Sequence, residues 1–214
     1  MTSRFAQLAF TESVRSRQEQ HHSRDAYARL EQGPPVPDRL SEAEADFIAT
    51  RDSFYLASVG EDGWPYVQHR GGPEGFLRVL DPGTIAFADF RGNRQYITTG
   101  NLLGNDRVAL LLMDYPRQAR LKILGRARVV EPPSPELLEA LTPGDYRARI
   151  ERAVVITVEA YDWNCRQHIR PRFTIEEVES AVAPLRERLA ELDQENAQLR
   201  AAGASDGRAG RGRQ

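Results

Sequence analysis

"PYVQHRGGPEGF" occupies Pro65 to Phe76, where one extended segment ends and the next begins. Three of its positions, Gly71, Gly72 and Gly75, are glycines that fall within five consecutive residues. Glycine weakens strand pairing and loses much backbone entropy on folding. A strand end therefore keeps three glycines only where the chain turns tightly or where another group comes close to the backbone.

The three residues before the glycines carry polar side chains. Side chains of a strand alternate between its two faces, so we expect Gln68 and Arg70 on one face and His69 on the other. An amide and a guanidinium beside bare backbone suit a flat polar ligand, whose edge can donate and accept hydrogen bonds. A tight turn with a surface arginine explains the same residues without a ligand, and these residues alone leave both interpretations open.

The segments around this stretch have the period and composition of β-strands. Turn signals separate them, such as "EDG" at 61–63 and "DPG" at 81–83. We expect six or seven strands, at residues 53–60, 64–70, 76–80, 84–90, 107–114, 120–131 and 153–163. Short turns and few long helices favour a β-rich α+β fold built on an antiparallel barrel over a parallel doubly wound sheet.

Helical segments flank and interrupt the strands. Residues 1–39 are polar and helix-prone and end in the linker "GPPVPD". Ser41 and Glu44 have the spacing of a capping box at the start of the main domain, residues 40–173. We expect a short helix within residues 95–105 and a mostly helical insert at 132–150.

A different period begins after residue 173. Thr174 and Glu177 have capping-box spacing, and the apolar positions that follow are three and four residues apart. This is an a/d heptad, formed by Ile175, Val178, Val182, Leu185, Leu189, Leu192, Asn196 and Leu199. We predict a heptad helix over 174–201, interrupted at Pro184, and a disordered Gly/Arg-rich tail over 202–214.

The heptad helix has two interpretations. Leucine at three d positions and asparagine at one a position predict a parallel two-stranded coiled coil over residues 185–199. An amphipathic helix folded back on its own barrel would bury the same leucines. Two heptads are too few to be stable in isolation, so the coil requires a dimer held elsewhere.

A second polar cluster is "DFRGNRQ", which runs from Asp89 to Gln95. Arg91, Asn93 and Arg94 surround Gly92 just before a predicted helix. A helix N-terminus presents unpaired N–H groups, and arginines offer bidentate donors, so this loop is a candidate phosphate site. An exposed basic turn is the alternative. Together, the glycine-rich and basic loops suit a ligand with a flat head and a phosphate tail.

A third stretch, "YDWNCRQHI" at 161–169, offers the stacking surface of Trp163 and the amide of Asn164. We interpret Cys165 as a small apolar filler rather than a nucleophile. Lys122 is a further cationic candidate, although its strand position also allows it to face solvent. No CxxC or HExxH spacing occurs, so we expect no metal site.

Composition narrows the possible function classes. A formal net charge of −2 gives no general attraction to nucleic acid, and no apolar run is long enough for a membrane span. The single cysteine and the lack of an apolar signal core indicate a reducing, cytoplasmic setting.

Four segments together resemble the pyridoxamine 5′-phosphate oxidase-like family, and most closely its flavin-nucleotide-binding branch. They are "FYLASVGEDGWPYVQHRGGPEGFLRVLD", "FADFRGNRQYITTGNLLGNDRVALLLMDYP", "RLKILGRARVVE" and "DWNCRQHIRPRF". The resemblance implies an antiparallel split β-barrel that forms a homodimer and holds FMN at the subunit interface, with a small-molecule substrate that the sequence does not identify.

The resemblance also implies roles for individual residues. The strand before the glycines would line the flavin ring, the basic loop would hold the phosphate, and the segment with Trp163 would complete the partner's pocket. The implied cofactor-binding residues are Gln68, His69, Arg70, Gly71, Gly72, Asp89, Arg91, Gly92, Asn93, Arg94, Gln95, Lys122, Trp163 and Asn164. No catalytic acid or base is implied.

The chain departs from the family after Arg172. Pyridoxamine phosphate oxidases end in a substrate-binding Arg-Leu-x-Pro segment, whereas this chain continues into the heptad helix. The sequence therefore predicts a flavin-dependent oxidoreductase of unknown substrate rather than a typical pyridoxamine phosphate oxidase. A non-catalytic flavin carrier or sensor, and a related barrel that binds deazaflavin or haem, are the alternatives.

Overall fold

The computed structural model describes residues 3–142, 144, 146–163 and 167–209. The chain divides into two compact units, with the boundary between Arg170 and Pro171. The helices are α1 (Arg4–Ala9), α2 (Glu12–Gln20), α3 (Arg24–Ala28), α4 (Glu42–Ala49), α5 (Ile97–Gly104), α6 (Pro135–Leu141) and α7 (Ile175–Ala209), with a 3₁₀ turn at Arg29–Glu31. The strands are β1 (Ser53–Val59), β2 (Pro65–Gly71), β3 (Leu77–Asp81), β4 (Thr84–Phe90), β5 (Arg107–Asp114), β6 (Ala119–Val130) and β7 (Ile150–Trp163).

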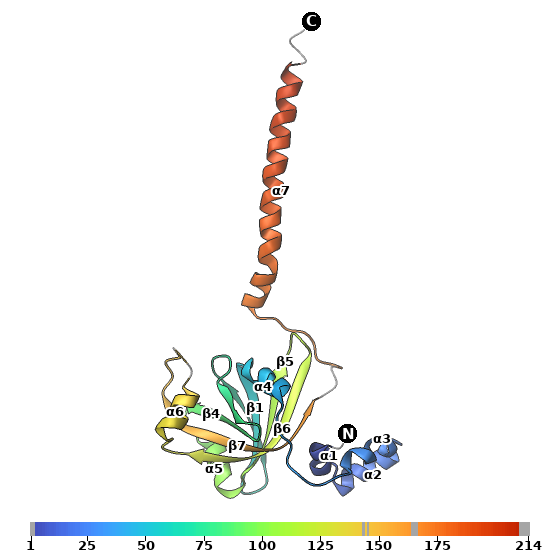
Figure 1. Ribbon diagram of the computed structural model, residues 1–214, viewed down its shortest axis with the longest axis vertical. Helices are drawn as coiled ribbons and strands as arrows, with labels where there is room; N and C mark the ends of the chain where they lie inside the picture. Colours follow the sequence, from blue (N-terminus) through green and yellow to red (C-terminus); the bar gives the residue numbers. More distant parts are fainter. Residues whose placement is uncertain (1–2, 143, 145, 164–166, 210–214) are drawn as a thin grey trace. The chain divides into compact units, whose positions relative to one another are not determined.

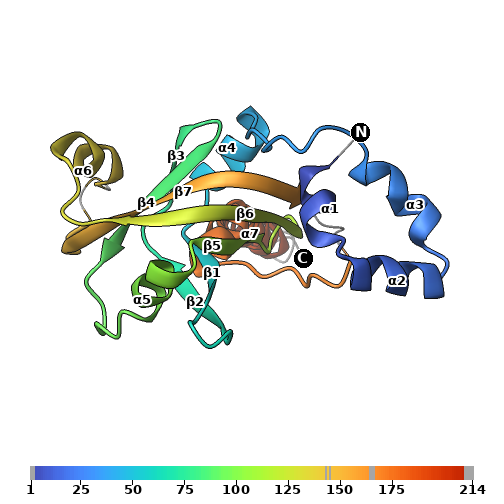
Figure 2. The same cartoon turned by 90° about the horizontal axis from the view of Figure 1, so that it is seen from below.

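All seven strands form one antiparallel sheet in the order β2-β1-β5-β6-β7-β4-β3. The long strands β6 and β7 run through its middle, and α1–α3 and α6 lie at opposite ends of it (Figures 1 and 2). The sheet is curved into a split barrel, in which β2 and β3 are the free edges. The predicted antiparallel α+β barrel is confirmed.

Alternation along the strands builds the core of the barrel. β1 buries every second residue, and the side chains of Phe54 and Leu56 are at most 1% exposed. Phe54 stacks on Phe76 at 5.5 Å between ring centroids and meets the edge of Phe87 at 5.2 Å. The apolar pattern of the sequence therefore determines which face of each strand is internal.

The predicted capping box at the start of α4 is present. The backbone N–H of Ser41 donates to Glu44 Oε2 at 2.9 Å, and the Ser41 side chain accepts from the first turn. The linker before it is attached to β7, because the backbone N–H of Asp38 donates to the carbonyl of Glu159 at 3.1 Å. The insert at 132–150 is predicted to be mostly helical, but in its described residues the helix is limited to α6 (Pro135–Leu141), so this prediction is corrected.

The glycines after β2 have a structural cause. A Cβ on Gly72 would lie 2.6 Å from Cγ of Phe76, and the Gly72 N–H already donates to the carbonyl of Asp52 at 2.9 Å. Gly75 has a φ of +74°, and its Cβ would lie 2.8 Å from the carbonyl oxygen of Ala49. The close neighbours of these two glycines are the protein's own core and backbone, so the interpretation that a ligand excluded their side chains is corrected.

The second unit consists mainly of α7. Thr174 and Glu177 form the predicted capping box, with hydrogen bonds of 2.8 and 3.1 Å. The helix is continuous through Pro184 rather than interrupted there, and it extends to Ala209, beyond the predicted boundary at residue 201 (Figure 1). No helix in the described part of the chain has the length and apolar character needed to cross a membrane.

We expect Gly72→Ala to lower the free energy of unfolding by about 1–3 kcal/mol, because the added methyl group displaces the buried Phe76 ring. Gly100→Ala is the matched control. Its Cβ would meet nothing within 4 Å, so in α5 it should stabilise the protein by about 0.5–1 kcal/mol. Urea unfolding of both variants tests the pair, and equal stabilities would contradict the packing explanation.

Candidate functional site

A polar cleft opens where β2, the end of β4 and the start of α5 come together. Its volume is about 430 Å³ including its open mouth. Seven predicted residues line it: Gln68, Arg70, Asp89, Gly92, Asn93, Arg94 and Gln95. The structure thus brings the strand before the glycines and the basic loop to one site.

The floor of the cleft is an ionic cluster around Asp89. Arg70 Nη1 lies 2.5 Å from Asp89 Oδ1, and Arg152 Nη1 lies 3.0 Å from Asp89 Oδ2. Arg152 also donates to Glu131 at 3.0 Å and to Glu151 at 3.2 Å. Asp89 and Arg152 are 6% and 7% exposed, so these charges are stabilised mainly by one another.

Arg152 is held in its charged form. Burial acts to lower the pKa of its guanidinium, but hydrogen bonds with Glu131, Asp89 and Tyr96 outweigh that effect and raise the pKa above its ordinary value. The cleft therefore keeps a permanent cation at its base.

The basic loop is connected to this floor through Tyr96. The Arg152 guanidinium lies 4.9 Å from the centre of the Tyr96 ring, and Arg94 Nε donates to the Tyr96 hydroxyl at 2.9 Å. Arg94 and Tyr96 both have left-handed backbones, with φ of 61° and 57°. Such conformations are costly for residues other than glycine and are held by surrounding contacts.

The start of α5 is open toward the cleft. Tyr96 occupies the N-cap position, and within the described residues no side chain caps this end of the helix. Thr98 of the first turn donates to the Gln68 amide oxygen at 2.9 Å, which fixes the orientation of that amide. An uncapped helix N-terminus beside Arg94 has the electrostatics of an anion site.

The remaining predicted residues lie elsewhere. Arg91 is not among the residues that line the cleft, and its Nε lies 3.6 Å from a carboxylate oxygen of Glu151. His69 faces the other side of β2, against Tyr55. The cleft is not lined by Gly71, Gly72 or Lys122. Asn164 and Cys165 lie outside the described residues.

Lys122 and Tyr55 belong to an outer apolar groove. It has a volume of about 1030 Å³ including its open mouth. Its lining comes from Phe5 of α1 and from β1, β2, β5 and β6: Tyr55, Ala57, Val67, Ala109, Leu110, Leu111, Arg120, Lys122, Ile123 and Leu124. Tyr55 and Val67 are 39% and 61% exposed, and with the other apolar residues of the lining they form a contiguous apolar surface.

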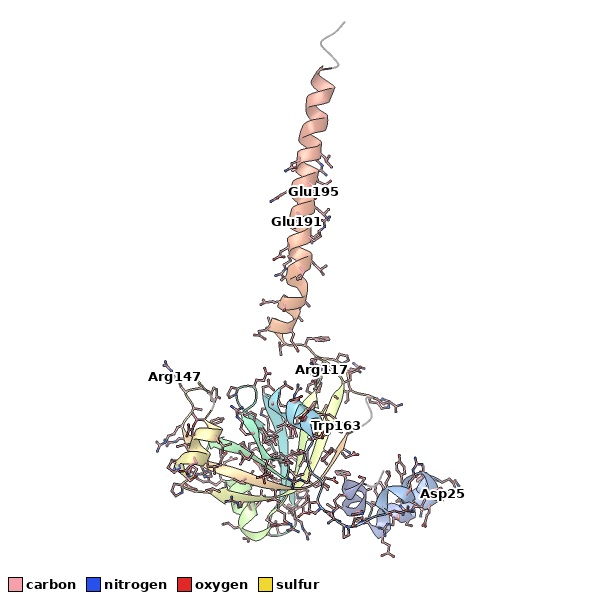
Figure 3. All side chains as sticks on the ribbon, in the orientation of Figure 1. Asp25, Arg117, Arg147, Trp163, Glu191 and Glu195 are labelled. Carbon is pink, nitrogen blue, oxygen red and sulfur yellow. The ribbon has the colours of Figure 1, made fainter. Side chains whose placement is uncertain are left out.

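Trp163 lies at the far end of β7 from the cleft. Arg152 lines the cleft, and Trp163 is eleven residues further along the same strand, a separation of roughly 35 Å. Figure 3 shows Trp163 and Arg147 at opposite ends of the sheet, and Tyr146, next to Arg147, contacts Phe90 at the cleft end. Trp163 therefore cannot enter the cleft of its own chain.

The Trp163 indole is held in place within its own chain. Its Nε1 donates to Glu44 Oε1 at 2.7 Å, and its ring meets Phe47 edge-on at 4.8 Å. Burial acts to raise the pKa of the Glu44 carboxyl, but hydrogen bonds from Ser41 and Trp163 favour the charged form, and the net pKa lies below its ordinary value.

Sequence reasoning missed several residues of the cleft. They are Tyr66, Phe90, Tyr96, Ile97, Thr98, Thr99, Glu151 and Arg152. A signal existed for Arg152, because it shares a strand face with Val154 and Ile156, where a charge requires a buried partner.

A family model described as "Pyridoxamine 5′-phosphate oxidase" matches residues 40–180. A search of curated proteins found no match. Similar solved structures include an FMN-binding protein from Syntrophomonas wolfei, at 15% identity and a TM-score of 0.45 over 72% of this chain and 96% of that one. A protein from Clostridium acetobutylicum related to general stress protein 26 of B. subtilis has 15% identity and a TM-score of 0.42 over 64% and 94%. An F420 reductase has 19% identity and a TM-score of 0.41 over 60% and 100%.

We expect Asp89→Asn to destabilise the protein by up to about 3–5 kcal/mol, because it removes the counter-ion that the buried Arg152 and the partly buried Arg70 share. Asp106→Asn is the matched control. Its ion pair with Arg126 is 47% exposed on both sides, so its loss should cost about 1 kcal/mol or less. Similar unfolding midpoints for the two variants in guanidinium chloride would contradict the role of Asp89.

We expect the stabilising effect of Glu44 to depend on pH. Because its pKa is lowered on folding, its contribution is present above its unfolded pKa, about 4.3, and is lost as pH falls through the folded value. Glu44→Gln should therefore reduce the free energy of unfolding by about 1 kcal/mol at pH 7 and by progressively less as the pH falls below about 4. The exposed Glu42→Gln should show little difference at pH 7 or pH 3, and a deficit for Glu44→Gln that is as large at pH 3 as at pH 7 would contradict the assignment.

Proposed function

Because the chain belongs to the pyridoxamine 5′-phosphate oxidase family, we propose that it is an FMN-binding flavoprotein, and a flavin-dependent oxidoreductase. The observation that carries the proposal is the conjunction of Arg94, Tyr96 and the uncapped start of α5 at one end of a polar cleft. A phosphate monoester is the group that such an end binds best.

The phosphate end of the cleft fits FMN in charge. Three arginines and two carboxylates line the cleft, so its ionisable side chains have a positive balance. Arg94 is exposed and, among the described residues, the hydrogen bond recorded for its side chain is the one from Nε to the Tyr96 hydroxyl, which leaves its terminal nitrogens available. A Cβ on Gly92 would meet nothing within 4 Å, so the backbone here is open to a ligand.

The other end of the cleft fits the edge of a flavin ring. Gln68 presents an amide whose oxygen accepts from Thr98, so its NH₂ group is directed as a donor. Arg70 lines the same end of the cleft, where its Nη1 is held by Asp89. Bound FMN would supply the electron transfer, while these residues would position the ring and adjust its electronics.

The apolar groove supports a homodimer as the functional form. A second copy of the chain is the occupant that we propose for it, because the groove is mostly apolar and lies on the reverse face of the strand that carries Gln68 and Arg70. The position of Trp163 supports the dimer, since this ring is too far along β7 to serve its own cleft. In the proposed dimer, Trp163 of one subunit would contribute to the FMN site of the other.

The proposal is tested by titrating the purified protein with FMN and following the quenching of flavin fluorescence. We expect saturation at about one FMN per chain at micromolar concentrations or below, and reduction of the bound flavin by NADH, NADPH or another donor under anaerobic conditions. A protein that neither carries a chromophore nor quenches FMN would refute flavin binding. A Soret band would indicate haem, and preference for a deazaflavin would redirect the cofactor assignment.

We expect Arg94→Ala to weaken FMN binding by roughly 10- to 150-fold, the equivalent of about 1.5–3 kcal/mol for a charge-assisted contact. Riboflavin lacks the phosphate, so its affinity should change by less than about threefold. Arg126→Ala, which removes an exposed arginine outside the cleft, should affect neither ligand. Equal losses of FMN and riboflavin affinity would remove Arg94 from the phosphate role.

A further inference from the structure

The helix α7 presents a stripe of exposed leucines. Leu185, Leu189, Leu192 and Leu199 are 64%, 61%, 37% and 70% exposed, and they recur at intervals of four, three and seven residues. The remaining position of the stripe is Asn196. A row of leucines on one face of a helix is unfavourable in water, so this face requires an occupant.

We propose that residues 185–199 form a parallel two-stranded coiled coil with a second copy of this chain. In heptad notation Leu185, Leu192 and Leu199 are at d, and Leu189 and Asn196 are at a. The proposal rests on the barrel dimer inferred above, because two heptads are too short to associate stably without it.

The charges beside the stripe fit a second copy of the same chain. In a parallel pair, Arg188 at g faces Asp193 at e of the partner copy, and Glu195 at g faces Arg200 at e. Both contacts join opposite charges. Within one chain Arg188 already lies 2.7 Å from Glu191, an exposed pair that is readily exchanged for an interchain one.

Asn196 selects the parallel direction. An antiparallel pair also matches opposite charges, but it places Asn196 against an apolar d position, where its amide finds no partner. In the parallel pair Asn196 meets its own copy, and the two amides bond to each other across the seam. One polar a position is a well-attested means of fixing two strands in one register.

The start of α7 agrees with this seam. The capping box of Thr174 and Glu177 ends the extended segment just before the first a position, Ile175. Pro184 falls at a c position, away from the seam, and the helix passes through it unbroken. The a/d register before Pro184 therefore continues without a shift into residues 185–199.

Single-cysteine cross-linking tests the proposal in the full-length protein. Cys165→Ser provides a background without cysteine, and Leu192→Cys then places a thiol in the seam at d. Gln194→Cys, at the outward-facing f position two residues away, is the matched control. Under mild oxidation we expect Leu192→Cys to form covalent dimers at least about fivefold more completely than Gln194→Cys, since d positions of parallel strands face each other.

Asn196→Cys, also in the seam, gives a second readout if Leu192→Cys folds poorly, and it should cross-link as well. Sedimentation and FMN titration of the same variants separate this proposal from the previous one. A dimeric, FMN-binding protein without cross-links at 192 and 196 would overturn the coil alone and would favour a helix folded back on its barrel. Three outcomes would overturn the parallel coil. The first is cross-linking of Gln194→Cys as complete as that of Leu192→Cys, and the second is a monomeric protein. The third is cross-linking only in mixtures of Leu189→Cys and Leu192→Cys chains, which would indicate an antiparallel pair.

Discussion

The structure depends on one carboxylate, Asp89, which joins parts of the barrel that do not pair in the sheet. β2 and β4 are separated by four strands in the sheet order, yet Arg70 of β2 and Arg152 of β7 both bond to Asp89 of β4. Charge pairs taken out of water, such as those of Asp89 with Arg70 and Arg152, are a poor source of net stability, because desolvation offsets most of the attraction. Their effect is geometric, since the ion pair between Arg70 and Asp89 joins the β2 edge of the sheet to β4 where backbone pairing does not.

This geometry is also what makes the cleft polar. At its base, Asp89 follows the buried Phe87 by two residues on β4, and Arg70 of β2 pairs in register with the buried Phe54 of β1, so charged side chains begin where the apolar core ends. Tyr96 connects the buried cluster to the exposed basic loop, because its ring lies next to the Arg152 guanidinium and its hydroxyl accepts a hydrogen bond from Arg94. Two energetically unfavourable features, a buried ionic cluster and a loop with left-handed residues, therefore occur together at the cleft. Such a combination is typical of a binding site rather than of a structural turn.

Local patterns in the sequence were sufficient for much of this picture. Alternation correctly placed Gln68 and Arg70 on one face and His69 on the other, and the order of loop and helix brought the 89–95 segment to the same cleft. Local patterns do not show which residues from distant parts of the sequence become neighbours in the fold. Gly72 is explained by Phe76, and Arg152 reaches Asp89 across 63 residues. Trp163 bonds to Glu44 across 119 residues, a partner that no spacing rule indicates.

Glu44 connects these observations to the proposed dimer. One of its oxygens completes the cap of α4, and the other accepts the indole N–H of Trp163, so a single carboxylate fixes both the start of a helix and the orientation of a half-exposed ring. A side chain fixed in this way has already lost its rotamer entropy before any association, which lowers the cost of binding. Because Trp163 is too far from its own cleft to serve it, this fixed ring is part of the proposal that the chain functions as a homodimer. The coiled coil proposed for α7 is a separate part of the same proposal, because pairing the Asn196 amides requires a second copy of the chain in parallel orientation.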